Sequence, residues 1–294
     1  MSSLDLDALR RRLPPSPLTR FAPAPTGYLH LGHAVNAVFV WGLARALGGR
    51  VLLRIEDHDR GRVRAEYDRA LLEDLSWLGL EADVGPVRQS DDGPVYAERL
   101  AALAAAHHVY GCDCSRSELG PGPYPGRCRT RGLGWGRCRG VRVELGPGVE
   151  RFEDGLLGPQ AQEPAAQSGD LLLRDRLGNW TYQFAVVVDD LRQGVDLVVR
   201  GADLLDSTGR QLALGRLLGR PAPPIFLHHP LILKPSGEKL SKANRDTGLG
   251  ELRARGWSPD RVLGEAAARG GLLPQARRLA ADELARLFTS QPAA

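Results

Sequence analysis

The stretch that most constrains this chain is residues 18–49, in which a short apolar run breaks off and an uncharged helical pattern follows. The apolar run reads as the end of a β-strand, and two prolines and Gly27 stop it. A second apolar run, residues 34–41, carries no charge and leads on to a double glycine at positions 48 and 49. Its length and its lack of charge predict a mostly buried α-helix.

Two histidines, His30 and His33, lie where the predicted strand gives way to the predicted helix. The N–H groups and the dipole of a helix N-terminus favour a bound anion at such a place. Gly32, between the histidines, would let a nucleotide approach the backbone closely. An H-x-x-H pair taken alone is equally compatible with a metal site or with ordinary surface residues, so the flanking residues decide its meaning.

All the lysines of the chain lie in one short segment. The sequence has 39 lysine and arginine residues together, and only Lys234, Lys239 and Lys242 are lysines. Arginine serves almost every other basic position, which suggests that this segment has a task that arginine does poorly. A compact ammonium group that moves onto a phosphate is such a task.

Buried strands alternate with helical patterns along most of the chain. Residues 51–55 form an apolar strand pattern that ends in Glu56 and Asp57, and residues 64–78 and 94–108 have helical periodicity. This alternation predicts an α/β fold with a doubly wound parallel sheet. Ligands bind at the carboxyl ends of the strands of such a sheet, so the two acids are candidates for ligand contact. The alternative is a solvated strand end that caps the next helix.

Residues 110–168 interrupt the alternation. They are rich in glycine, proline and arginine, and they contain every cysteine of the chain. Clustered cysteines in a chain that is expected to be cytoplasmic favour metal binding over disulfides. The four cysteines are Cys112, Cys114, Cys128 and Cys138, which is enough for a closed tetrahedral zinc site, and spacing alone makes an all-cysteine set the natural guess.

The alternation resumes after this region. The expected elements are strands at 170–174, 195–200 and 226–233, a buried segment at 180–190, a helix from about 201 to 218, and helical segments after Ser258 and over 276–288. The last strand leads directly into the segment that holds the lysines.

Residues 20–33, Arg-Phe-Ala-Pro-Ala-Pro-Thr-Gly-Tyr-Leu-His-Leu-Gly-His, resemble the HIGH region of class I glutamyl-tRNA synthetases and their relatives. Leu31 stands where isoleucine is usual, which keeps volume and apolar character. Residues 239–244, Lys-Leu-Ser-Lys-Ala-Asn, resemble the second motif of the class, KMSKS, with leucine for methionine and Ala243 for the final serine. Both motifs occur in the order of the class, and together they imply that ATP activates an amino acid.

The resemblance also implies roles for single residues. His30, His33, Lys239 and Lys242 would be catalytic, and His30, Gly32, His33 and Lys242 would bind ATP, which Mg²⁺ accompanies. The glutamate site would consist of Arg20, Phe21, Ala22, Pro23, Ala24, Glu56, Tyr182 and Arg200. In this set Arg20 would bind the γ-carboxylate and Glu56 the α-ammonium group. Ala24 stands where serine is common, and Arg200 has the alternative role of a structural ion-pair residue.

The resemblance narrows further in the cysteine region. The family of glutamyl-queuosine tRNA(Asp) synthetases has a C-x-C…Y-x₃-C pattern with a tyrosine as the fourth zinc ligand, and Cys112, Cys114, Tyr124 and Cys128 match it. Cys138 remains the competitor of Tyr124. The chain also ends about fifty residues after Lys242, which is too short for the anticodon-binding domains of a long glutamyl enzyme.

We therefore expect the class I synthetase fold, divided into a loosely held leader (1–17), two halves of a catalytic nucleotide-binding domain (18–109 and 169–235), a zinc-binding insertion (110–168), and a KMSKS-like loop with a C-terminal helical segment (236–294). The implied partners are L-glutamate and the anticodon arm of tRNA(Asp) with queuosine at the wobble position. No run of about 18 apolar residues occurs. A cytoplasmic monomer that does not bind membranes is expected.

Two other functions remain open. One is a truncated glutamyl- or glutaminyl-tRNA synthetase that charges an ordinary 3′ end. The other is a catalytically silent paralogue that binds RNA, against which the intact ATP motifs count.

Overall fold

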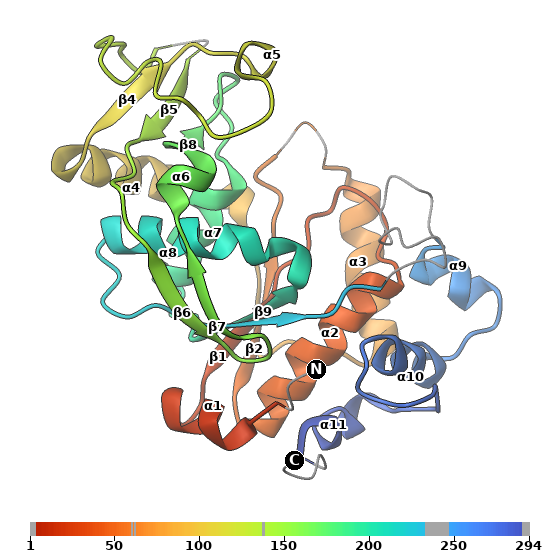
Figure 1. Ribbon diagram of the computed structural model, residues 1–294. Coiled ribbons are helices and arrows are strands. Elements are labelled where there is room, and N and C mark those ends of the chain that lie inside the picture. Colours follow the sequence, from red (N-terminus) through yellow and green to blue (C-terminus); the bar gives the residue numbers. More distant parts are fainter. Residues whose placement is uncertain (1–3, 60, 62, 137–138, 233–246, 290–294) are drawn as a thin grey trace.

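A computed structural model describes residues 4–59, 61, 63–136, 139–232 and 247–289. In this part of the chain the central sheet has five parallel strands in the order β10-β9-β1-β2-β3 (Figure 1). They are β1 (Leu18–Phe21), β2 (Arg50–Ile55), β3 (Val84–Arg88), β9 (Leu197–Gly201) and β10 (Ile225–His229). The prediction of a doubly wound α/β fold is confirmed. Because the strand order reverses between β1 and β9, the sheet has its switch point there.

The two faces of the sheet differ in character. Successive side chains of a strand point to opposite faces. Leu53 of β2, Val199 of β9 and Leu227 of β10 belong to the apolar core that includes α2 (Leu31–Ala46). The opposite face carries polar groups at the same level, namely Arg20, Arg54, Arg200 and His228. The sheet therefore gathers its buried charge on one side.

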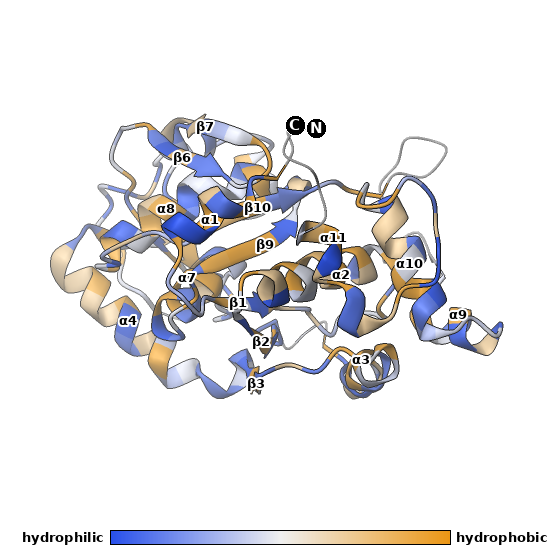
Figure 2. Cartoon of the chain, turned by 90° about the horizontal axis from the view of Figure 1, so that it is seen from below, coloured by the Kyte–Doolittle hydropathy of each residue, from blue (hydrophilic) through white to orange (hydrophobic). Residues whose placement is uncertain are grey.

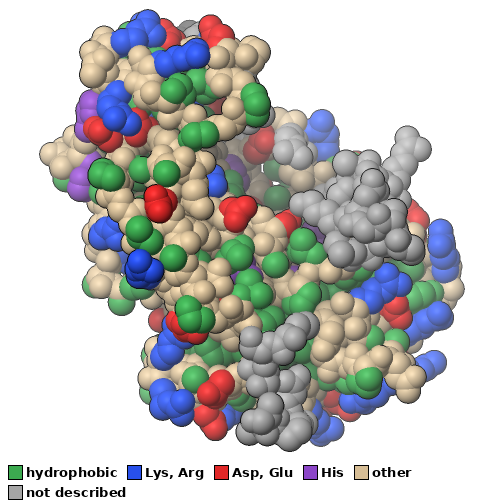
Figure 3. All heavy atoms as spheres, viewed as in Figure 1, with side chains coloured by type: hydrophobic (Ala, Val, Ile, Leu, Met, Phe, Trp, Pro, Cys, Tyr) green, Lys and Arg blue, Asp and Glu red, His purple; other side chains and the backbone are tan. Residues whose placement is uncertain are grey.

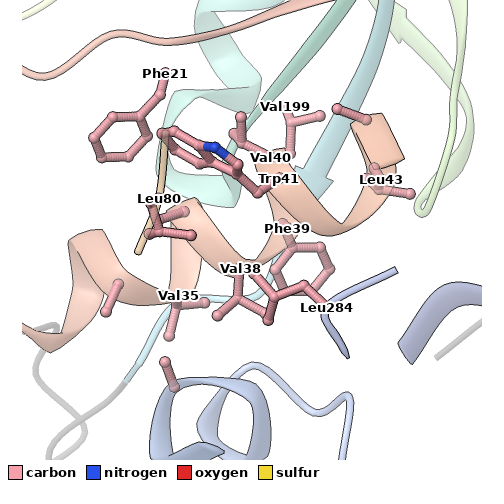
Figure 4. Packing of buried hydrophobic residues seen from close by; sticks show 14 of the residues in the cluster. Phe21, Val35, Val38, Phe39, Val40, Trp41, Leu43, Leu80, Val199 and Leu284 are labelled. Atoms are coloured by element: carbon pink, nitrogen blue, oxygen red, sulfur yellow. The ribbon is translucent and has the colours of Figure 1, made fainter. Parts of the chain in front are cut away.

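Helix α2 lies between the sheet and the C-terminal helices. It has no acidic residue in its first turn, and twelve of its residues are buried. Figure 4 shows Trp41 and Val40 near Phe21 and Val199, while Phe39 points toward Leu284. Helices α10 (Pro259–Arg269) and α11 (Arg286–Thr289) cover α2 on its other side. The uncharged run 34–41 within α2 is explained by this burial on both sides.

The other side of the sheet holds α7 (Tyr182–Arg192) and α8 (Thr208–Leu217), and Figure 2 shows hydrophobic β9 between α2 and these helices. A smaller antiparallel sheet in the order β4-β5-β8 adjoins α7. Its strands are β4 (Val109–Cys112), β5 (Gly140–Val143) and β8 (Leu171–Arg174), and they share an apolar core with α4 (Gly93–Ala106), α7 and α8.

Residues 150–162 form a hairpin of β6 (Glu150–Asp154) and β7 (Gly158–Gln162). From the sequence, this hairpin is expected in the same insertion as the cysteines. The structure packs it elsewhere, against β10 and α8. The backbone N–H of Gly155 donates to the carbonyl of Phe226 at 2.8 Å. Region 110–168 is thus divided between the cysteine cluster and the edge of the central sheet.

The chain ends differ from expectation in two places. Helix α1 (Leu6–Arg12) buries Leu6 and Leu9 in the main core, so this part of the leader is firmly packed. The helix expected over 276–288 is replaced by an extended segment, η4 (Ala281–Glu283) and α11. The backbone at Arg277 passes directly over Gly264 of α10, and the N–H of Leu279 donates to the carbonyl of Asp260. This packing holds the segment extended.

The remaining elements are α3 (Ala65–Leu78), α5 (Arg116–Leu119), α6 (Pro164–Ser168), α9 (Leu249–Ala254), η1 (Gln89–Asp91) and η2 (Ala202–Ser207). Within the described ranges, no helix is both long enough and apolar enough to span a membrane.

Candidate active site

A pocket of about 380 Å³ opens at the switch point of the central sheet. Figure 3 shows this face hollowed between the part that carries β4, β5 and β8 and the part that carries α2 and α3. Eight of the residues predicted from the sequence line the pocket: Arg20, Ala22, His30, Gly32, His33, Glu56, Tyr182 and Arg200. They come from four separate segments, and the carboxyl ends of β1, β2 and β9 bring them together.

Three predicted glutamate contacts do not line this pocket. The ring of Phe21 lies in the apolar core, 5.2 Å from the ring of Trp41 between centroids. The carbonyl of Pro23 accepts a hydrogen bond from the backbone N–H of Glu56 at 3.0 Å, and the carbonyl of Ala24 accepts one from Thr26. Pro23 therefore helps to fix the backbone of Glu56 through this hydrogen bond.

The two histidines cap their own helix. Nδ1 of His30 accepts from the backbone N–H of Gly32 at 3.1 Å, and Nδ1 of His33 accepts from the backbone N–H of His30 at 3.1 Å. A neutral imidazole has one donor and one acceptor, so both rings carry their proton on Nε2. The pocket is thereby provided with two N–H donors at a helix N-terminus, an arrangement suited to phosphate oxygens.

A buried group of alternating charges extends from the pocket into the protein, and two of its members, Arg20 and Glu56, line the pocket. Nη2 of Arg54 lies 2.6 Å from Oδ1 of Asp190, and Nε of Arg20 donates to the same oxygen at 3.3 Å. Nη1 of Arg54 lies 3.9 Å from Oε1 of Glu56 and finds no hydrogen-bond partner. Arg54 therefore lies between Asp190, which also contacts Arg20 of β1, and Glu56 at the end of β2.

The pKa values of the two acids move in opposite directions. Burial raises the pKa of Glu56, and the opposing effect of Arg54 is smaller. Burial alone would also raise the pKa of Asp190, but Arg54 and Arg20 together hold the pKa of this carboxyl below its usual range. Asp190 is thus the fixed anion of the network, whereas the nearest cation of Glu56 is Arg54 at 3.9 Å, too far for a hydrogen bond. An ammonium group in the pocket would supply a closer cation.

Arg200 and Tyr182 face the pocket from the other side of the switch point. Burial lowers the pKa of Arg200 and raises the pKa of Tyr182. Nη1 of Arg200 donates to Oε1 of Gln211 at 2.6 Å, and Nη2 donates to Oγ1 of Thr208 at 2.8 Å. No acidic side chain pairs directly with Arg200 among the described contacts, so its charge is available to a carboxylate ligand.

Asn36 lines the pocket and was not predicted. Its amide lies 3.0 Å from Nε2 of His229, whose Nδ1 is bound to the carbonyl of Pro230 at 2.9 Å. Burial lowers the pKa of His229 to about 4. A signal was present in the sequence, because Asn36 is the single polar residue of the run 34–41.

Sequence reasoning also missed Asp189 as part of the network. Oδ2 of Asp189 accepts from the hydroxyl of Tyr96 and from the amide of Gln89, both at 2.8 Å. Asp189 and Asp190, at the end of the segment 180–190, are consecutive on α7, and each binds a different set of side chains. The predicted catalytic residues Lys239 and Lys242 lie outside the described residues.

The cysteine cluster lies apart from the pocket. The Sγ atoms of Cys112, Cys114 and Cys128 all lie within 4.8 Å of one another. The hydroxyl oxygen of Tyr124 is 3.5 Å from Sγ of Cys112, and it accepts from the backbone N–H of Cys128 at 2.9 Å. Cys138, the competing ligand, lies outside the described residues. Three thiols and a phenol therefore surround one point.

The spacing of these atoms fits a tetrahedral zinc ion. Zn–S bonds of about 2.3 Å place ligand sulfurs roughly 3.8 Å apart. Sγ of Cys114 and Sγ of Cys128 are separated by 3.6 Å. Around the cluster, Arg142 stacks over the ring of Tyr124 at 3.7 Å, so the phenol is held in place from outside. The donor set suits a closed structural site.

The fold and the pocket together define the catalytic domain of a class I aminoacyl-tRNA synthetase. The family model for class I tRNA synthetases (E and Q), catalytic domain, matches residues 18–121 and 141–289. A solved glutamate tRNA ligase from Elizabethkingia meningosepticum superimposes with a TM-score of 0.78 over 92% of this chain and 64% of that chain, at 24% identity.

Relatives with higher sequence identity show which family within this class the chain belongs to. A glutamyl-Q tRNA(Asp) synthetase of Nitratidesulfovibrio vulgaris is 43% identical over 87% of this chain and 86% of its own length. One from Bordetella bronchiseptica is 49% identical over 76% of this chain and 74% of its own length. A glutamate–tRNA ligase of Oleidesulfovibrio alaskensis is 39% identical, but the match covers only 61% of its length. The chain belongs to the glutamyl-Q tRNA(Asp) synthetases.

Proposed function

We propose that this protein activates L-glutamate with ATP and transfers it to queuosine at the wobble position of tRNA(Asp). The observation that carries the proposal is the 43% identity to a glutamyl-Q tRNA(Asp) synthetase over most of both chains. The pocket supports it, because Arg20 and Glu56 offer opposite charges to an amino acid with a second carboxylate.

In the first step an oxygen of the glutamate α-carboxylate attacks the α-phosphorus of ATP. The bond to pyrophosphate breaks, and glutamyl-adenylate forms. Arg20 and Arg200 bind the γ-carboxylate in this proposal, and Glu56 binds the α-ammonium group. The Nε2–H groups of His30 and His33 donate to phosphate oxygens, on which charge develops. Mg²⁺ accompanies the ATP, and Lys239 and Lys242 neutralise the leaving pyrophosphate.

The protein has little covalent work in this step. It aligns the attacking carboxylate with the phosphorus and stabilises charge on the phosphates. The remaining predicted pocket residues have supporting roles. Gly32 permits close approach of the nucleotide, Ala22 leaves room beside the substrate, and Tyr182 contacts it. Phe21, Pro23 and Ala24 do not line the pocket, and they contribute by fixing the position of the end of β1.

In the second step a hydroxyl of the cyclopentene ring of queuosine attacks the carbonyl carbon of the adenylate. AMP leaves and an ester remains on the modified base. A compact catalytic domain positions one stem-loop through phosphate contacts and reads its splayed loop bases. We infer that the tRNA presents its anticodon arm to the pocket in this way, and that the enzyme acts as a cytoplasmic monomer.

Zinc has a structural part in this proposal. Cys112, Cys114, Tyr124 and Cys128 would hold it, and it would tie together a region with a small apolar core of its own. A four-ligand site has no open position for substrate. No step of the reaction passes through it.

Two assays test the function. The first is pyrophosphate exchange with glutamate, run with and without tRNA, and we expect exchange without tRNA. Exchange that needs tRNA would favour a truncated glutamyl-tRNA synthetase, and no exchange in either case would favour a silent RNA-binding paralogue.

The second assay compares tRNA(Asp) that carries queuosine with the same tRNA that carries guanosine at the wobble position. Labelled glutamate should appear only on the first. Periodate oxidation of the unmodified tRNA blocks its 3′ end and detects any residual charging there. Equal labelling of both tRNAs, or labelling of tRNA(Glu), would contradict the proposal.

A further inference from the structure

Arg200 is held by a chain of buried hydrogen bonds that leads away from the pocket. Its Nε donates to Nε2 of His228 at 3.0 Å, and Nδ1 of His228 lies 2.6 Å from Oδ2 of Asp154. Arg200 and His228 are register partners in the paired strands β9 and β10. The side chains of His228 and Asp154 are both completely buried. Asp154 belongs to the β6–β7 hairpin, far from Arg200 in sequence.

The partners of His228 determine which of its nitrogens carries the proton. A guanidinium only donates, so Nε2 of His228 must accept from Arg200. The proton of the neutral ring is then on Nδ1, and it is donated to Asp154. Burial and the nearby Arg200 lower the pKa of His228 against the opposing effect of Asp154, which keeps the ring neutral.

The two oxygens of Asp154 have different surroundings. Oδ1 accepts from the backbone N–H groups of Leu156 at 3.0 Å, Leu157 at 2.9 Å and His228 at 3.3 Å. Oδ2 faces the ring of His228. The turn of the hairpin therefore holds the carboxylate in one orientation, with an acceptor directed at Nδ1.

We propose that Asp154 and His228 are positioning residues, which hold Arg200 for the substrate carboxylate by keeping Nε2 of His228 an acceptor. This inference rests on the proposed function, because it takes Arg200 as a glutamate contact. Neither Asp154 nor His228 lines the pocket. They act through the guanidinium, whose other nitrogens Gln211 and Thr208 hold. Loss of the acceptor leaves a buried Nε–H without its partner, and the guanidinium then keeps only its contacts with Gln211 and Thr208.

Asp154→Asn tests the proton position with almost no change in shape. Three N–H donors surround the Oδ1 position, so the amide oxygen must occupy it. The NH₂ group then faces Nδ1 of His228 and forces the ring proton onto Nε2, opposite the Nε–H of Arg200. A hydrogen bond to a charged group is worth about 1.5–3 kcal/mol, so we expect the KM for glutamate to rise roughly tenfold to a hundredfold. The KM for ATP should change little.

His228→Gln separates the proton position from the loss of the ring. The carboxamide oxygen of glutamine can accept from Arg200 whatever residue stands at 154. We therefore expect Asp154→Asn to be harmful beside His228 and nearly neutral beside Gln at that position. A double variant whose KM for glutamate falls back to that of His228→Gln supports the proposal. A double variant as poor as Asp154→Asn, or poorer, would overturn it.

Asp83→Asn is the matched control. Asp83 also accepts from a backbone N–H, that of Val51 at 2.7 Å, and from an arginine, Arg45, at 2.7 Å, but it lies at the opposite end of the sheet. This variant should lower the melting temperature while the KM for glutamate stays unchanged. Thermal unfolding of every variant shows that the comparison is made between folded proteins. A KM for glutamate that is unchanged in Asp154→Asn, or that rises together with the KM for ATP, would overturn the proposal.

Nitrogen-15 NMR of the imidazole rings gives a readout that needs no activity. The signals of His228 are those that disappear in His228→Gln. We expect protonated Nδ1 in the wild-type protein and protonated Nε2 in Asp154→Asn. The same proton position in both would overturn the proposal even if the protein activated no glutamate, so this failure is distinguishable from failure of the proposed function.

Discussion

Arg54 lies 2.6 Å from Asp190 in a contact from which solvent is almost completely excluded. The same carboxylate oxygen is 3.3 Å from Nε of Arg20. Arg54 is thus the main counter-ion of Asp190, and the longer contact binds Arg20 more weakly. One arginine is therefore committed to the fold, while the other keeps its charge for a ligand that enters the pocket.

Replacing Arg54 by Met should be strongly destabilising, because it leaves the buried Asp190 and Asp189 with only their longer ion-pair contacts, to Arg20 and Arg192, both at 3.3 Å. We expect the free energy of unfolding to fall by about 3–5 kcal/mol in urea denaturation. Arg255→Met is the control, since Arg255 and Glu251 form an ion pair in which both side chains are exposed. An exposed pair contributes about 0–1 kcal/mol. Similar losses in the two variants would contradict this assignment.

The affinity for glutamate should fall as the pH falls. Burial raises the pKa of Glu56 in the free protein, against the smaller effects of Arg54 and His58. Below that raised pKa the side chain is a neutral acid and cannot pair with an ammonium group, whereas above it the pair forms. The KM for glutamate in pyrophosphate exchange, measured from about pH 8 downward, should rise before an ordinary glutamate with a pKa of about 4.3 would protonate. In Glu56→Gln the KM should be higher throughout and independent of pH in this range.

Metal analysis of the purified protein should find one zinc per chain. Cys112→Ser should release it and make residues 110–146 more susceptible to proteolysis, because a structural zinc site contributes folding energy. Tyr124→Phe identifies the fourth ligand, since a phenyl ring cannot coordinate. Normal zinc content in Tyr124→Phe together with loss in Cys138→Ser would mean that the site is an all-cysteine site.

Lys242→Arg should keep the charge and still lose most of the glutamate activation. The guanidinium is a rigid planar fork, whereas this position requires a compact charge that follows a moving phosphate. Loss of one such transition-state contact costs about 2.7–4 kcal/mol, which is roughly a hundredfold to a thousandfold in kcat. Near-normal turnover of the arginine variant would contradict the hypothesis that the clustered lysines have a task that arginine cannot perform.

The sequence predicts the parts of this site that are encoded locally. His30, Gly32 and His33 follow from a strand that breaks before an uncharged helix, and Glu56 follows from its place at the end of a strand. The buried partners of Arg20 and Arg54 could not be predicted in the same way. Asp190 is 136 residues from Arg54 and 170 residues from Arg20, and only the packing of α7 on the sheet brings them together.

Tertiary packing also overruled local patterns. Residues 276–288 have a helical pattern, yet contact with α10 keeps the first part of them extended. Residues 150–162 follow the cysteines without an apolar run, and nothing in their composition indicates that they pack against β10 at the edge of the central sheet. Asp154 and Gln162 lie on this hairpin and contact residues of β10 and α8, so the omission hid two buried polar contacts.

The mutual caps of His30 and His33 have a practical consequence for mutagenesis and grafting. The N–H groups that donate to their Nδ1 atoms belong to the backbone of the same turn, within three residues, so these two bonds form wherever this helix N-terminus forms. Alanine at either position removes a helix cap as well as a phosphate donor, and the resulting rate loss overstates the catalytic share. Asparagine at position 30, which retains a capping oxygen, separates the two contributions.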